Sequence, residues 1–279
     1  MMKRLLCVLA LVLSSPGLFA AVRYEFRQTT RSDFQTMPPT DVQGKAIIDG
    51  DQSRVDFVSG SAYGPGSYMI TSGGAQKLYI VNPTDKTYSM VDVAGSAGAL
   101  GSSPITINNL KSKFEKLGDH PVIAGLPTEH YRMIATYDIT VLFGTIPLTQ
   151  GVETVIEKWV TTAFGDVGAT FLLTGAPKTG NANLDKVLDA ETADVKGLPL
   201  RQLITISTTS EAVKGRKSEL RLSPTRKQTS EMVVTSVQAL PVISPVMFQV
   251  PATYRRVDNI KGTIDQNPVT DLSMEPVDQ

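Results

Sequence analysis

The chain has 279 residues, and its 27 lysine and arginine residues balance 27 aspartate and glutamate residues, so the formal net charge is zero. Hydrophobic residues make up 41% of the sequence and charged residues 19%, which are ordinary values for a folded protein. This composition excludes a disordered charged protein and leaves no overall positive charge with which to bind nucleic acid.

The first 20 residues have the pattern of a secretory signal peptide. Residues 3 and 4 are basic, Leu5–Leu13 is an apolar run, and a Ser-Ser-Pro-Gly stretch ends it. The run is too short to span a bilayer, which takes about 20 residues. We therefore predict cleavage after Ala20, with cleavage after Ala21 as the alternative. We also predict a soluble periplasmic product and no transmembrane segment in the mature chain. The sole cysteine, Cys7, would be removed with the signal peptide, leaving no thiol or disulfide chemistry.

Apolar and polar residues alternate with a period of two along much of the mature chain, which is typical of half-buried β-strands. Among the early strands, two are predicted over Gln76–Val81 and Lys86–Val93. The Asn-Pro-Thr-Asp sequence at residues 82–85 predicts a tight turn between them, as in a hairpin.

Residues 94–104 are rich in glycine, alanine and serine and are predicted to form a flexible loop within the domain. The next segment, Ile105–Leu117, fits two structures. Its apolar residues have helical spacing, but the segment leads through Gly118 toward the next strand as a hairpin arm would. Both structures stay open at this point, and we favour the strand.

The clearest predicted strand is Glu129–Phe143. One face of this strand carries His130, Arg132, Thr136, Asp138 and Thr140. The other face is apolar and carries Tyr131, Met133, Ala135, Tyr137, Ile139, Val141 and Phe143. At about 3.3 Å per residue the strand would be about 50 Å long, longer than most strands. Such a length indicates a large curved antiparallel sheet.

The later sequence predicts two short helices, over residues 167–174 and Asn183–Ala190, among further strands. These strands are predicted over Leu200–Thr208, Arg216–Leu222 and Thr229–Ala239. The whole pattern predicts an α+β fold dominated by β-structure, with about ten or eleven strands in one large antiparallel sheet.

We predict one folded domain at residues 21–257, followed by a disordered acidic tail at residues 258–279. The tail has five acidic residues, one basic residue and no aromatic residue. It therefore has little apolar surface with which to offset the entropy of ordering.

The sequence contains little that predicts catalysis. Of the two histidines, His120 lies in a predicted turn and His130 on the polar face of the long strand, where we expect a surface histidine. No spacing of cysteine, histidine and acidic residues predicts a metal site, and neither a nucleophile elbow nor a phosphate loop occurs. We expect no enzyme activity and no cofactor. A hydrolase with an unrecognised carboxylate or serine site is the enzymatic alternative.

Short motifs occur at intervals along nearly the whole mature chain. They are Tyr24-Glu25-Phe26, residues 49–57, Asn82-Pro83 to Tyr88, residues 124–131, Trp159, residues 197–200 and residues 248–254. Together they resemble the LolA/LolB-type periplasmic lipoprotein-carrier superfamily, in particular its uncharacterised secreted relatives. The resemblance implies a half-open β-barrel whose concave apolar face is covered by a few short helices and can hold acyl chains.

We therefore expect a non-enzymatic periplasmic protein that binds or carries a hydrophobic ligand, either a lipid or an acylated protein. The candidate ligand-binding residues are Tyr131, Met133, Tyr137, Ile139, Val141 and Trp159. The alternative is an envelope scaffold protein that binds another envelope protein and whose sheet packs on itself without a cavity, since an apolar sheet face must be covered by something.

Overall fold

The computed structural model of the protein describes residues 21–33, 38–60, 64–72, 77–93, 95, 105–143, 146–165, 181–191, 195–210 and 225–258. The first half of this part contains β1 (Ala21–Ser32), β2 (Thr40–Asp49), β3 (Gln52–Ser59), β4 (Tyr68–Ser72), β5 (Lys77–Asn82), β6 (Thr87–Asp92) and β7 (Ile105–Lys116). The second half contains β8 (Val122–Ile123), β9 (Leu126–Pro127), β10 (Glu129–Phe143), β11 (Ile146–Thr161), α2 (Ala182–Glu191), β12 (Leu198–Ser210), β13 (Arg226–Leu240), the 3-10 helix η1 (Pro245–Phe248) and β14 (Arg255–Arg256).

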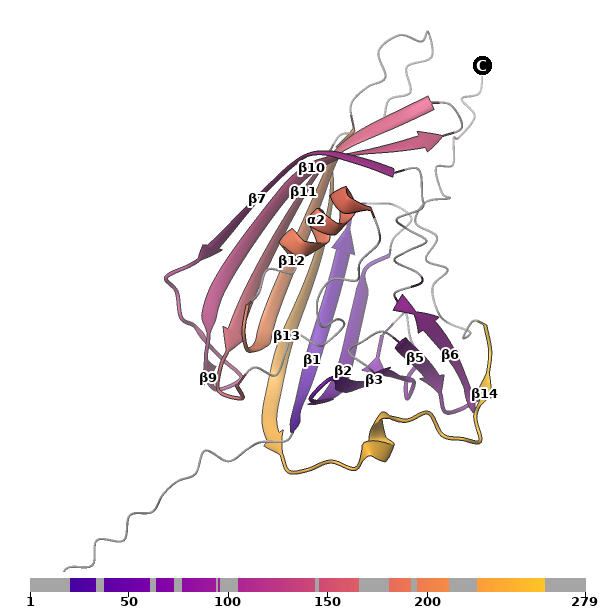
Figure 1. Cartoon of the computed structure of the whole chain (residues 1–279). Helices are drawn as coiled ribbons and strands as arrows, with labels where there is room; N and C mark the ends of the chain where they lie inside the picture. The colour runs from indigo at the N-terminus through magenta and orange to yellow at the C-terminus, as the bar shows by residue number, and fades with distance from the viewer. Residues whose placement is uncertain are drawn as a thin grey trace, which may run out of the picture.

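Twelve of the strands form one large sheet, in the order β14-β6-β5-β4-β3-β2-β1-β13-β12-β11-β10-β7. All neighbouring strands in it are antiparallel except the short parallel pair of β14 and β6. Strands β8 and β9 form a separate small hairpin. The large sheet curves strongly, and its two ends stay apart (Figure 1). The predicted architecture, a half-open β-barrel, is confirmed.

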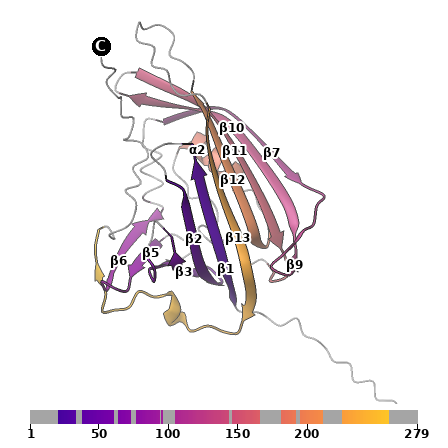
Figure 2. The ribbon, with the colours of Figure 1, turned by 180° about the vertical axis from the view of Figure 1, so that it is seen from behind.

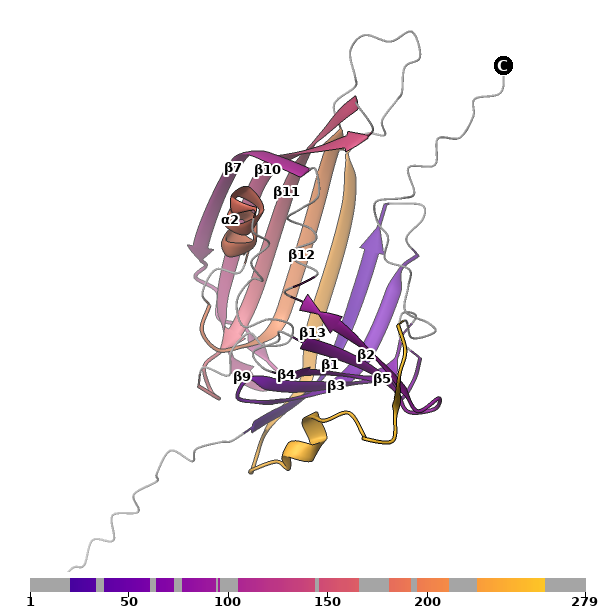
Figure 3. The same ribbon diagram turned by 45° about the vertical axis from the view of Figure 1, so that its right-hand side comes forward.

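Helix α2 lies on the concave side of the sheet, where it contacts β7 and β10. It is drawn in front of the sheet in Figures 1 and 3 and behind it in Figure 2. Asn181 caps its first turn, since its side-chain oxygen accepts hydrogen bonds from the backbone N–H groups of Asn183 and Leu184. Val187, on the side that faces the protein, is buried. The helix thus covers the concave side over the part of the sheet nearest to the β7 edge.

The main hydrophobic core lies on the concave side of the N-terminal strands. Tyr24 and Phe26 of β1 pack there with Val55 of β3 and with Leu198 and Leu200 of β12. The outer side of the same strands has a second, smaller core, in which Phe248 of η1 covers residues of β2, β4 and β5. This part of the sheet is therefore packed on both sides.

Several predicted elements agree with the structure. The long strand β10 has the predicted bounds, and Ile105–Leu117 forms a strand, β7, rather than a helix. The helix predicted over Asn183–Ala190 corresponds to α2. The helix predicted over residues 167–174 and the strand predicted over Arg216–Leu222 lie outside the described residues, as do residues 1–20, most of the loop at 94–104 and residues 259–279.

Candidate ligand-binding face

The concave face of β10, β11 and β12 carries rows of apolar side chains that the strand register brings together. Met133 of β10 pairs with Ile156 of β11, which pairs with Ile204 of β12. Parallel rows on the same face are Ala135–Thr154–Ile206 and Tyr137–Val152–Thr208. Opposed residues in an antiparallel pair point to the same face. These rows therefore form one continuous surface, which we call the concave apolar face.

The concave apolar face is covered unequally. Met133, Val152 and Ile156 are 5–7% exposed. Farther along the strands and toward β12 the apolar side chains are only half-buried; these are Ile139, Val141, Ile204 and Ile206. The face therefore keeps accessible apolar surface at these four positions.

Lys158, a half-buried charged residue of β11, lies on this face. Its partners in the register are Tyr131 of β10 and Gln202 of β12. Burial lowers the pKa of the Lys158 ammonium group, because a cation loses hydration when it is moved out of water. Glu129 lies on the same face, opposite Val160 in the register, and accepts hydrogen bonds from Lys116 and Tyr131. These bonds hold the pKa of Glu129 below its ordinary value.

Five of the six predicted site residues share the concave apolar face, as expected from their alternation along β10. They are Tyr131, Met133, Tyr137, Ile139 and Val141. The assignment of Trp159 to the same surface is wrong, because the register pairs Trp159 with His130 on the outer face of the sheet. Its sequence neighbours Lys158 and Val160 alternate with it and point to the concave side. Alternation within β11 could not reveal which set of residues joins the apolar face of β10.

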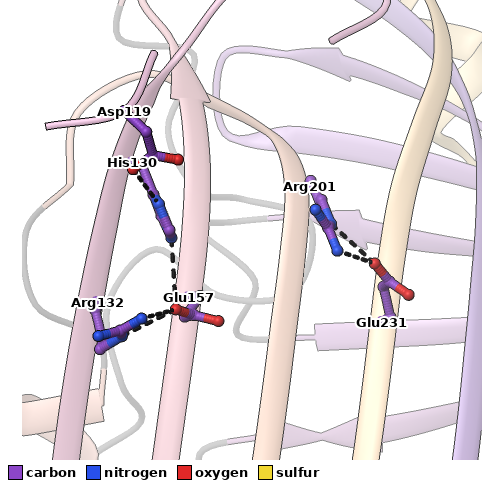
Figure 4. Close-up of polar contacts among 6 residues, drawn as sticks. All are labelled: Asp119, His130, Arg132, Glu157, Arg201 and Glu231. Atoms are coloured by element: carbon purple, nitrogen blue, oxygen red, sulfur yellow. Dashed lines mark hydrogen bonds and ion pairs between the residues drawn. The ribbon is translucent and has the colours of Figure 1, made fainter. Parts of the chain in front are cut away.

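The expectation of a surface position for His130 is also wrong. Its side chain is 7% exposed and lies between two carboxylates, with Nδ1 2.7 Å from Oδ1 of Asp119 and Nε2 3.6 Å from Oε1 of Glu157 (Figure 4). The imidazole ring stacks on Trp159, with 4.1 Å between ring centroids. Asp119 comes from the segment before β8 and Glu157 from β11. Alternation within β10 therefore contained no signal for either contact.

His130 and Trp159 belong to a polar and aromatic cluster that links four strands on the outer face. The guanidinium of Arg201 lies 4.4 Å from the centre of the Trp159 ring. It also forms an ion pair with Glu231 of β13 (Figure 4). Arg132 pairs with Glu157 at 2.7 Å. A histidine beside a carboxylate is half of a general-base pair, but among the described residues nothing hydrogen-bonds to Nε2 of His130. The cluster therefore has the features of a clamp that holds β10–β13 together.

Acid should weaken this clamp through Asp119. The hydrogen bond from His130 holds the pKa of the Asp119 carboxyl below its ordinary value of 3.8, and a hydrogen bond from Trp159 acts in the same direction. A carboxyl group whose pKa is lowered in the folded state stabilises that state at any pH above its ordinary pKa. This contribution is lost as the pH falls through the lowered pKa. We expect Asp119→Asn to unfold at lower urea concentration than the wild type at pH 7, and the difference to shrink below pH 3.8.

Urea denaturation across this pH range measures the difference. Asp51→Asn, in the exposed turn after β2, is the matched control and should follow the wild type at every pH. A difference between the wild type and Asp119→Asn that does not change with pH would contradict the assigned role of the carboxylate.

A polar depression of about 610 Å³ lies farther along the outer face. Its lining includes Thr136, Asp138, Glu153, Ser207 and Thr209. These side chains give the depression a hydrophilic character, in contrast to the concave face. The described residues contain no cluster of three or more potential metal ligands. In the same part of the chain, no helix is long and apolar enough to cross a membrane.

The fold can be compared with solved structures. An uncharacterised conserved protein from Thermus thermophilus is 7% identical, with a TM-score of 0.33, and the match covers 86% of this chain and 91% of that one. A LolA superfamily protein from Nitrosomonas europaea is 8% identical, with a TM-score of 0.31 and coverage of 83% and 91%. Lipovitellin, from a structure of its lipid–protein interactions, is 9% identical, with a TM-score of 0.31 and coverage of 81% and 26%.

Comparison with curated proteins found no match. The family model DUF4412, described as a domain of unknown function, matches residues 34–254. This match extends from the segment before β2 to the segment before β14, and so includes the whole of the concave apolar face. The chain therefore belongs to the DUF4412 family.

Proposed function

We propose that the protein is an exported, non-enzymatic binding or carrier protein that holds the apolar part of a lipid or acylated molecule against the concave apolar face. The observation that carries the proposal is the half-buried apolar surface formed by Ile139, Val141, Ile204 and Ile206. The signal-peptide pattern of residues 1–20 supports export, and with it a location in the periplasm.

The dimensions of the elements support an incompletely covered face. Helix α2 has ten residues and is therefore about 15 Å long. Strand β10 has 15 residues and extends for about 50 Å. One such helix covers only part of the apolar face along this strand. Each methylene group that a ligand buries there would contribute about 0.8 kcal/mol to binding, so an acyl chain is a favourable occupant.

Two substitutions at adjacent residues of β10 test the proposal. Ile139 points to the concave face, whereas the Thr140 hydroxyl meets the Thr149 hydroxyl on the outer face. In the mature protein, the neutral fluorescent probe N-phenyl-1-naphthylamine should bind the wild type and Thr140→Glu equally. Ile139→Glu should reduce probe affinity at least tenfold, because a carboxylate without a partner in an apolar site costs several kcal/mol.

Circular dichroism shows whether each variant is folded. If Ile139→Glu unfolds, Ile139→Thr, which keeps the branched shape, replaces it and should weaken probe binding with the fold intact. Absence of probe binding by the folded wild type would overturn the proposal and favour a scaffold protein whose sheet has no ligand site. Equal loss of affinity in Ile139→Glu and Thr140→Glu would place the binding site elsewhere.

A further inference from the structure

Lys158 lies on the concave face of the sheet, and the residues directly beside it in the register are uncharged. Along β11 its neighbours on this face are Ile156 and Val160, which are both buried. Across the strands its neighbours are Tyr131 and Gln202. A lysine on the surface of a strand normally keeps its ammonium group in water. At Lys158, burial instead opposes the charged form.

Three other basic side chains, on β7, β10 and β12, have partners of opposite charge. Lys116 pairs with Glu129 at 2.6 Å. On the other face Arg132 pairs with Glu157, and Arg201 with Glu231, both at 2.7 Å. No carboxylate of the described residues lies within ion-pair distance of Lys158. Glu129, next to it in the register, is already bound by Lys116 and by the Tyr131 hydroxyl.

A half-buried cation without a counter-ion destabilises the folded state unless something else supplies the negative charge. An anionic ligand on the concave side would do so at this position. Gln202 adds amide hydrogens on the same face, and an amide hydrogen can bond to a carboxylate oxygen. A site with one cation and one amide matches a single carboxylate better than a group with two negative charges.

The position of Lys158 relative to the apolar residues also suits an amphiphilic ligand. From the row of Tyr131 to the row of Ile139 the strand advances by eight residues, or about 26 Å. The rows between them include Met133–Ile156–Ile204 and Tyr137–Val152–Thr208. A polar head at Lys158 would therefore leave an apolar path of this length for one extended acyl chain.

We propose that Lys158 binds the carboxylate of a long-chain fatty acid whose chain lies along the concave apolar face. This inference rests on the proposed function, because it names the headgroup that the same surface recognises. The apolar rows hold the chain, while Lys158 selects for the negative charge and fixes the direction in which the chain lies. The ion pair forms in a partly desolvated place, where charge–charge attraction is stronger than in water.

Displacement of N-phenyl-1-naphthylamine by palmitate and by hexadecanol tests this assignment, because the two have chains of equal length and differ in charge. The wild type should bind palmitate more tightly than hexadecanol. Lys158→Met should lower palmitate affinity about tenfold or more, in line with the strength of hydrogen bonds between charged groups, and should leave hexadecanol affinity unchanged. Lys111→Met removes an exposed lysine on the outer face and should bind both ligands as the wild type does.

The melting temperature separates ligand recognition from a structural role. Because Lys158 has no ion-pair partner among the described residues, the Lys158→Met variant should melt at or above the temperature of the wild type. A clear fall would overturn the proposal, since it would show that Lys158 stabilises the fold.

The remaining outcomes separate this inference from the proposed function. If the probe binds but Lys158→Met lowers palmitate and hexadecanol affinity equally, the headgroup assignment fails and the apolar binding face stands. If neither ligand nor probe binds the wild type, the proposed function fails and the headgroup assignment fails with it. Displacement by lysophosphatidylglycerol at lower concentration than by palmitate would overturn the choice of a fatty acid.

Discussion

Gly197→Ala is expected to be among the most destabilising single substitutions in this protein, with a loss of about 3 kcal/mol. Gly197 has φ +112°, and a Cβ atom there would lie 2.5 Å from the backbone oxygen of Thr161. Alanine would therefore meet two penalties, a backbone conformation that non-glycine residues rarely adopt and a clash with backbone that cannot rotate away. Each penalty is worth about 1–3 kcal/mol.

Two other glycines separate these penalties. Gly50 has φ +58° but open space around its Cβ position, so Gly50→Ala should show only the cost of backbone strain. Gly118 has open space and no positive φ, so Gly118→Ala should be nearly neutral. In urea denaturation, the free energy of unfolding should be lowest for Gly197→Ala, intermediate for Gly50→Ala and highest for Gly118→Ala. A neutral Gly197→Ala would mean that the ends of β11 and β12 are not held as closely as described.

Trp159→Ala should cost about 3–5 kcal/mol, as large-to-small substitutions of buried tryptophan do. The Trp159 side chain lies between the imidazole of His130 and the guanidinium of Arg201. Its loss would leave a gap in the outer-face cluster and remove contacts that join three neighbouring strands. Trp159→Phe should recover part of the stability, because a smaller aromatic ring still packs between the two neighbours.

The same substitutions check the face on which Trp159 lies. Thermal unfolding followed by circular dichroism measures the stability, since these variants lack the tryptophan that fluorescence would use. If Trp159 is on the outer face, the Trp159→Phe variant should bind the neutral probe with the affinity of the wild type. The Ile139→Glu variant should bind it more weakly. A large loss of probe affinity in Trp159→Phe, with the fold intact, would show that Trp159 contributes to the ligand site.

The sequence allowed prediction of those parts of the fold and site that depend on local pattern. Strand β10 was predictable because its alternation continues over 15 residues, and the same alternation placed Tyr131 and Ile139 on one face. The side to which Trp159 points was not predictable, because it depends on the register between β10 and β11. For the same reason, the sequence did not reveal that Lys158 lies beside Tyr131 on the apolar side.

Strand β7 is the last strand of the twelve-stranded order, and no other strand of the described residues pairs with its outer edge. This edge bears on how the protein behaves at high concentration. An unpaired edge can recruit a strand from another molecule and start aggregation. Along β7, Lys111, Lys113 and Lys116 are exposed, and a register shift opposite Thr136 and Asp138 interrupts the pairing with β10. Exposed lysine side chains and irregular pairing both disfavour strand addition. An open barrel of this kind can therefore leave its sheet unclosed without promoting edge-to-edge strand pairing between molecules.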